Sequence, residues 1–384
     1  MGQFADIRPY NDEEVPAVLR RLEGDKELVA ALASLKLGSW HKSFAALVYP
    51  VAGWLLKRQL RGISTVEGFQ HIIKRYMDSV IESSTTGFTV SGLDQLDPEK
   101  PYLFMSNHRD ITLDPAFVNY ALYHNEHDTV RVAIGDNLLT KPYVSDLMRL
   151  NKSFIVKRSA KGPRQILAAY KMLSQYIRHS IEEDKNPIWI AQREGRAKDG
   201  KDRTEPAIIK MLAMSQDKKS ESFADYINAL HVVPVSISYE LDPCDGAKAK
   251  ELYTIAAHGS YEKTEHEDVA SIATGIAGNK GKVHVAFGTP LTGEFDDADA
   301  VAAAIDQQVI SSYVLHPSNF FAYKMLHGEY PEGLVSSEQR PFSIKGLEAE
   351  ERAFQQRIKA LPVDHQPYAL GIYANTIDQK KTLN

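Results

Sequence analysis

The 384-residue chain contains a single cysteine, Cys244, so it can form no intrachain disulfide and offers no cluster of thiolates for zinc. No apolar run reaches the roughly 18 residues that a membrane-spanning helix needs. Basic charge is not in excess either, since the formal net charge of −5 provides no global attraction to nucleic acid. The polar, acidic N-terminal segment lacks the basic and apolar regions of a secretory signal. These absences predict a protein of a reducing, cytoplasmic compartment that binds no nucleic acid.

Motifs of several enzyme classes are also missing. No Gly-x-Ser-x-Gly sequence occurs, so the nucleophile elbow of the α/β hydrolases is absent. His108-Arg109-Asp110 matches the catalytic-loop triplet of protein kinases, but Pro115 stands where that pattern has asparagine. The best metal-ligand candidates, His108 with Asp110 and Asp114, lack further His or Cys at helical spacing. We therefore expect no metal site.

The chain is predicted to begin with a helical region over residues 1–84. Apolar periodicity predicts helices over 11–36 and 65–83. Between them, residues 44–58 are apolar, contain Trp54 and end in cations, which suits a segment lying in a membrane interface. A buried helical hairpin packed on the rest of the protein is the alternative interpretation of this segment.

Strand–helix alternation begins near Gly87 and predicts an α/β domain over residues 85–295. The apolar fraction of 43% and charged fraction of 25% are typical of a globular protein with a substantial core. Strands are expected over residues 89–92, 102–105, 130–134, 153–156, 188–191, 232–239 and 283–287, with helices over 115–123, 163–183 and 208–214. We therefore predict a mostly parallel central sheet flanked by helices, with functional residues where strands end. Residues 296–384 are predicted to form a helical and irregular extension packed on this core.

One stretch, Ser106–Pro115, carries the clearest chemical signal. His108 lies where a predicted strand passes into a predicted helix, and both Asp110 and Asp114 are near enough in sequence to hold its imidazole. A histidine that is oriented by a carboxylate is a candidate general base. From these residues alone, His108 could equally be a polar residue that caps the next helix.

Two other predicted strands end in groups that suit an anionic ligand. Lys157 and Arg158 follow the strand over 153–156. The strand over 188–191 is followed by two guanidinium groups, a carboxylate and a flexible backbone point, at Arg193, Glu194, Gly195 and Arg196. Arginine and lysine are the usual protein ligands of phosphate. A general base beside a group of anion-binding cations predicts deprotonation of a hydroxyl group on a phosphorylated substrate.

Four segments, in chain order, resemble successive blocks of the glycerolipid acyltransferase family: NHRDITLDP, FIVKRS, IAQREGRAKDG and VVPVSISY. This family comprises the 1-acylglycerol-3-phosphate and glycerol-3-phosphate acyltransferases, and the resemblance covers about residues 85–290. It implies transfer of an acyl group, from acyl-coenzyme A or an acyl-carrier protein, to a hydroxyl group of glycerol 3-phosphate or lysophosphatidate. It also implies a role in phospholipid synthesis, peripheral association with a membrane surface, and no cofactor.

The resemblance also implies residue roles, with two departures from the family pattern. The His block would supply the catalytic dyad, but five residues separate His108 from Asp114 where the family has four. We assign Asp114 as the partner because the following Pro-Ala-Phe-Val matches the family's helix, and Asp110 is the alternative.

The Lys157-Arg158 block and the Glu194-Gly195 block would contact the acceptor's phosphate. Arg196 directly follows Glu194-Gly195, where the family has a small residue first, so either Arg193 or Arg196 could face the phosphate. A non-catalytic protein that keeps the fold and binds lipid or a membrane surface is the alternative function.

Overall fold

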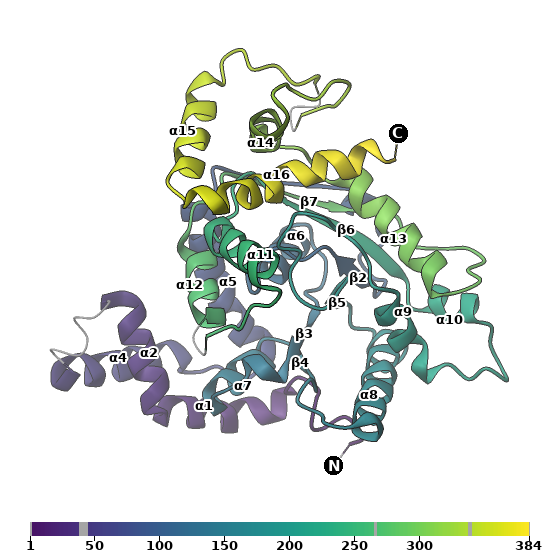
Figure 1. The fold of residues 1–384 in the computed structure, drawn as a ribbon. Coiled ribbons are helices and arrows are strands. Elements are labelled where there is room, and N and C mark those ends of the chain that lie inside the picture. Colours follow the sequence, from purple (N-terminus) through teal and green to yellow (C-terminus); the bar gives the residue numbers. More distant parts are fainter. Residues whose placement is uncertain (1, 38–44, 265–266, 337–339, 384) are drawn as a thin grey trace. The chain divides into compact units, whose positions relative to one another are not determined.

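The computed structural model describes residues 2–37, 45–264, 267–336 and 340–383 (Figure 1). The chain divides into two compact units. The first unit comprises Met1–Asp78 and Arg131–Tyr176, and the second comprises Ser79–Val130 and Ile177–Asn384. Each unit contains both strands and helices.

The second unit is built on a mostly parallel sheet. Its strand order is β1-β7-β6-β2-β5, with β1 at Gly87–Ser91, β2 at Leu103–Ser106, β5 at Ile188–Ala191, β6 at Val232–Tyr239 and β7 at Lys282–Phe287. β2 runs parallel to both β5 and β6, β1 runs parallel to β7, and only the β6–β7 pair of these is antiparallel. The predicted α/β fold class is therefore confirmed.

The burial of the central strands explains why they appear in the sequence as short apolar runs. Every residue of β2 and β6 is buried, as expected for parallel strands that are covered on both faces. Ser106, the last residue of β2, pairs with Ala191 at the end of β5 and with Val235 in β6. Because β2 and β5 end at the same level, the residues that follow them emerge at one edge of the sheet.

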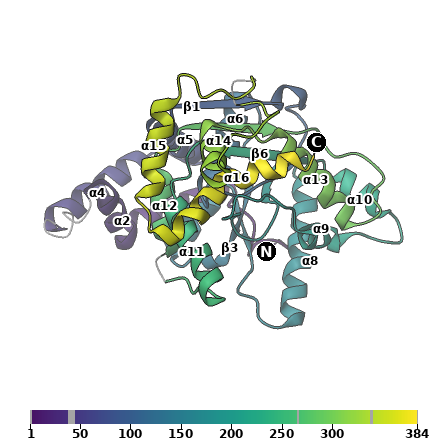
Figure 2. The same cartoon turned by 45° about the horizontal axis from the view of Figure 1, so that its top comes forward.

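Helices of the second unit pack around this sheet. They are α6 (Leu113–His124), α9 (Pro206–Leu212), α10 (Phe223–Ala229), α11 (Asp245–His258), α12 (Glu267–Ala277), α13 (Ala298–Ser312), α14 (Pro317–His327), α15 (Glu348–Lys359) and α16 (Gln366–Lys381). The last three pack together (Figure 2) around a core that includes Phe321, Phe354 and Tyr373. From α16, the Gln379 side chain bonds to the backbone N–H and C=O of Asp202, both at 2.7 Å.

The C-terminal extension is more helical than the sequence analysis predicts. Pro317 and Pro367, which favour irregular structure in the sequence, lie in the first turns of α14 and α16. Proline is tolerated there because the first N–H groups of a helix have no intrahelical partner. These prolines therefore begin helices and do not interrupt them.

The first unit contains a second parallel strand pair with helices around it. β3 (Arg131–Gly135) pairs with β4 (Ser153–Val156). The helices are α1 (Val15–Gly24), α2 (Lys26–Leu37), α4 (Ala45–Leu60) and α7 (Pro142–Leu150), and α5 (Val66–Ser84) and α8 (Pro163–Glu182) begin in this unit. Val15, Leu19, Leu22, Leu60 and Phe69 belong to its buried core.

The helical segment predicted over residues 11–36 contains two α-helices, α1 and α2. Asp25 separates α1 from α2, with an extended backbone at φ −81° and ψ 111°. Its side chain accepts the N–H of Leu28 at 2.9 Å, which caps the start of α2. Periodicity alone did not reveal this break because the apolar positions continue across it.

Helix α4 contains most of the apolar segment predicted over residues 44–58, of which Phe44 lies outside the described residues. α4 packs on α2, as a helical hairpin would. It nevertheless exposes one apolar face, because Leu47, Val51 and Trp54 are 72%, 57% and 57% exposed. In the described part of the chain, no helix has the length and apolar character needed to cross a membrane.

Candidate functional site

The His block and the Glu-Gly block meet at one edge of the second unit's sheet. The backbone N–H of Gln192 donates to Ser106 O at 2.8 Å, and the N–H of Ala197 donates to His108 O at 2.8 Å. The loop after β5 therefore folds back along the segment that carries His108. This arrangement is the one expected for residues that follow neighbouring parallel strands.

His108 and Asp114 form a hydrogen-bonded pair. His108 Nδ1 lies 2.8 Å from Asp114 Oδ2, the His108 side chain is 14% exposed, and that of Asp114 is fully buried. The Trp189 ring packs edge-on against the imidazole, with centroids 5.8 Å apart. No described residue hydrogen-bonds to His108 Nε2. An imidazole held through Nδ1 with Nε2 available has the arrangement of a general base.

Asp114 is held as an anion despite its burial. Its Oδ2 accepts the backbone N–H groups of Arg109 at 2.5 Å and Asp110 at 3.0 Å in addition to the His108 contact. Burial raises the pKa of Asp114, but the hydrogen bonds and charge of His108 and the hydroxyl of Tyr239 outweigh it. The pKa of this carboxyl therefore lies below its ordinary value.

Asp110, the alternative partner, has a different role in the structure. Its Oδ1 accepts the N–H of Thr112 at 2.9 Å and that of Leu113 at 2.8 Å, which closes a turn at the start of α6. Burial, then the nearby charge of Asp114, raises its pKa. Gly275 of α12 leaves room for this carboxylate, since a Cβ there would lie 2.1 Å from Asp110 Oδ2.

Arg109 connects the two blocks through contacts that its neighbours in the sequence do not reveal. The guanidinium is 6% exposed and donates to Ala197 O at 3.3 Å, Gly200 O at 3.1 Å and Asp202 Oδ2 at 2.7 Å. Asp202 also accepts from the Asn107 amide at 3.0 Å. The residues on both sides of His108 thus fix the course of the loop after β5.

The predicted phosphate ligands on that loop differ in their contacts. Gly195 adopts φ +75°, a left-handed conformation that favours glycine, and both Glu194 and Gly195 are exposed. Arg193 Nε lies 3.8 Å from Glu205 Oε1. Arg196 has no hydrogen-bond or ion-pair partner within the described ranges, so its guanidinium is the more available of the two.

Lys157 and Arg158 belong to the first unit, where they follow β4. Asp136, just after β3, accepts the backbone N–H of Arg158 at 3.0 Å and that of Ser159 at 3.1 Å. Lys157 Nζ lies 3.8 Å from Asp6 Oδ2. A carboxylate at the end of one strand therefore shapes the basic turn at the end of the next.

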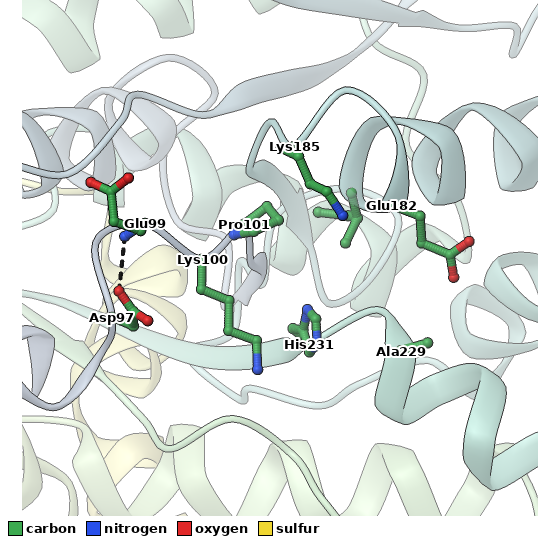
Figure 3. A pocket seen from close by; sticks show the side chains of 9 residues that line it. Asp97, Glu99, Lys100, Pro101, Glu182, Lys185, Ala229 and His231 are labelled. Carbon is green, nitrogen blue, oxygen red and sulfur yellow. Dashed lines mark hydrogen bonds between the residues drawn. The ribbon is translucent and has the colours of Figure 1, made fainter.

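A hollow of about 340 Å³ lies at the opposite edge of the second unit's sheet (Figure 3). Pro101, Lys185 and His231, which precede β2, β5 and β6, all line it. Burial, then the charge of Lys100, lowers the pKa of His231. This hollow contains none of the predicted site residues. In the described ranges, no group of three or more His, Cys, Asp or Glu side chains is arranged to hold a metal ion.

Comparison with known proteins supports the sequence resemblance. Residues 87–238 match the model of the family described as Acyltransferase. Dihydroxyacetone phosphate acyltransferases from Bos taurus and Homo sapiens are each 24% identical over 204 residues, which cover 53% of this chain and 28% of theirs. The chain thus matches less than a third of the length of these relatives.

Among solved structures, the chain is similar to the 1-acyl-sn-glycerophosphate (LPA) acyltransferase PlsC from Thermotoga maritima. The sequence identity is 14% and the TM-score is 0.38, over 70% of this chain and 89% of that one.

Proposed function

Because residues 87–238 match the Acyltransferase family model, we propose that the chain transfers a fatty acyl group from a thioester to a hydroxyl group of a three-carbon phosphate acceptor. Acyl-coenzyme A or an acyl-carrier protein would be the donor. Glycerol 3-phosphate, lysophosphatidate and dihydroxyacetone phosphate are the acceptors that the family and the relatives' names suggest. The observation that carries the proposal is the 2.8 Å contact between His108 Nδ1 and the buried Asp114, with Nε2 available.

In the proposed reaction, Asp114 holds His108 in the tautomer that carries its proton on Nδ1. Nε2 then takes the proton of the acceptor hydroxyl while the oxygen attacks the thioester carbonyl. The tetrahedral intermediate collapses, the C–S bond breaks, and the departing thiolate takes the proton from the imidazolium. The products are an ester and a free thiol. The ionised Asp114 stabilises the imidazolium while it exists.

Within the second unit, the acceptor's phosphate is proposed to bind the basic groups that follow β5, Arg193 and Arg196. On the loop after β5, Arg196 is favoured over Arg193 as the phosphate ligand. The carboxylate of Glu205 lies beside Arg193, whereas no described carboxylate pairs with Arg196. Gly195 would let the backbone approach the phosphate closely, since it has no side chain.

Peripheral association with a membrane surface is also proposed, through the exposed face of α4. Leu47, Val51 and Trp54 are spaced by four and three residues, so they share one side of the helix. Lys57 and Arg58 follow in its last turn, where they could contact anionic headgroups. A non-catalytic lipid-binding protein with the same fold is the alternative, and the altered spacing of the His block is the observation that favours it.

The most direct test is mass spectrometry of the products that form when purified protein is offered mixed acyl thioesters and phosphorylated acceptors. We expect an ester product and free thiol, and we expect His108→Ala to lower the rate by about 10²–10⁴, the usual contribution of a general base. His258→Ala, at an exposed position at the end of α11, is the matched control and should keep the wild-type rate. Lipid binding without turnover on any acceptor would instead support the non-catalytic alternative.

Acceptor binding should distinguish the two arginines after β5. We expect Arg196→Gln to raise the KM for the acceptor roughly tenfold with little change in kcat, because a charge-assisted hydrogen bond to phosphate is lost. Arg193→Gln should have a smaller effect, and steady-state kinetics with varied acceptor measures both. Equal effects of the two substitutions would refute the preference for Arg196.

Membrane association should depend on the apolar face of α4. Flotation with vesicles that contain anionic phospholipid should recover the wild-type protein with the lipid, whereas the double variant Leu47→Ser, Trp54→Ser should stay largely unbound. Val363→Ser removes a side chain that is 78% exposed elsewhere, and it should float like the wild type. Full flotation of the double variant would exclude α4 as the contact.

A further inference from the structure

Tyr239, the last residue of β6, contacts the dyad from a strand that is remote in sequence. Its side chain is 6% exposed, and its hydroxyl donates to Asp114 Oδ1 at 2.6 Å. Its ring packs edge-on against Phe117 of α6, with centroids 5.6 Å apart. The hydroxyl is therefore fixed by the strand behind it and by the helix that carries Asp114.

The two oxygens of Asp114 have different environments. Oδ2 accepts from His108 Nδ1 and from the backbone N–H groups of Arg109 and Asp110. For Oδ1, Tyr239 is the one donor that the described residues supply. Loss of this hydroxyl would leave a buried carboxylate oxygen unpaired, while the three bonds to Oδ2 remain.

We infer that Tyr239 is a positioning residue that fixes the carboxylate plane of Asp114 and, through it, the orientation and basicity of His108. The inference rests on the proposed role of His108 as base. A hydrogen bond to Oδ1 draws negative charge away from the oxygen that faces the imidazole. Its removal therefore strengthens the attraction between Asp114 and the imidazolium, so the imidazole should hold its proton to a higher pH.

Other charged groups lie near Asp114, Asp110 or Tyr239 and are unchanged by a substitution at Tyr239. Arg109 and Lys248 carry positive charge, and Asp110, Asp202 and Asp242 can carry negative charge. Lys248 Nζ donates to Arg109 O at 2.7 Å and pairs with Asp242. None of these side chains bonds to Oδ1 of Asp114. The effect of removing the Tyr239 hydroxyl is thus confined to one hydrogen bond.

The test compares Tyr239→Phe with Tyr373→Phe, a matched control. Tyr373 is 2% exposed, and its hydroxyl also donates to a buried carboxylate, Asp245 Oδ2, at 2.7 Å. In Tyr239→Phe we expect the NMR titration of the His108 imidazole to move upward by roughly one pH unit. The acid limb of kcat/KM should move with it, and kcat should fall roughly tenfold. Tyr373→Phe should leave the NMR titration of His108 and the acid limb of kcat/KM as they are in the wild type.

An unshifted His108 titration in Tyr239→Phe, or an equal shift in Tyr373→Phe, would overturn the inference. If Tyr239→Phe does not fold, incorporation of 3-fluorotyrosine at position 239 gives the opposite test. Its more acidic hydroxyl donates more strongly, so the titration should move to lower pH, and no movement would also overturn the inference. A fully active His108→Ala variant would instead refute the proposed function. The two failures are distinguishable because the NMR titration of His108 does not depend on turnover.

Discussion

The candidate site depends on one buried negative charge, the carboxylate of Asp114. An ionised group without solvent is stable only if its oxygens are satisfied, and Asp114 accepts four hydrogen bonds, from His108, Arg109, Asp110 and Tyr239. Two of these donors are backbone groups of the turn that precedes α6, so the turn must adopt this conformation for the charge to be held. The orientation of His108 follows from the same requirement.

The parallel sheet determines where the loop after β5 lies relative to His108 and Asp114. β2 and β5 end at the same level, and the loop after β5 is bound to the His108 segment by backbone hydrogen bonds and by Arg109. α16 contributes as well, because Gln379 holds Asp202, the carboxylate that pairs with Arg109. A segment from the end of the chain thus supports the loop that carries Glu194, Gly195 and Arg196, the predicted acceptor-binding residues of the second unit.

Much of the fold could be predicted from the sequence because its strands are buried and therefore apolar. The runs that form β2, β5 and β6 stand out between polar loops, and the motif that joins His108 to Asp114 is local. Tyr239 could not be found in this way, since 125 residues separate it from Asp114 and its contact exists only once β6 lies beside β2. Arg109 and Asp202 were missed for the same reason. The helical content of residues 296–384 was underestimated because proline favours irregular structure in a sequence, whereas Pro317 and Pro367 fit the first turns of α14 and α16.

The central claim is that Asp114 fixes His108 with its proton on Nδ1 and leaves Nε2 as the base. ¹⁵N NMR of the imidazole, at a pH where His108 is neutral, tests this directly because protonated and unprotonated ring nitrogens have distinct chemical shifts. The account predicts a protonated Nδ1 and an unprotonated Nε2 in the wild type. A proton on Nε2, with Nδ1 unprotonated, would contradict it.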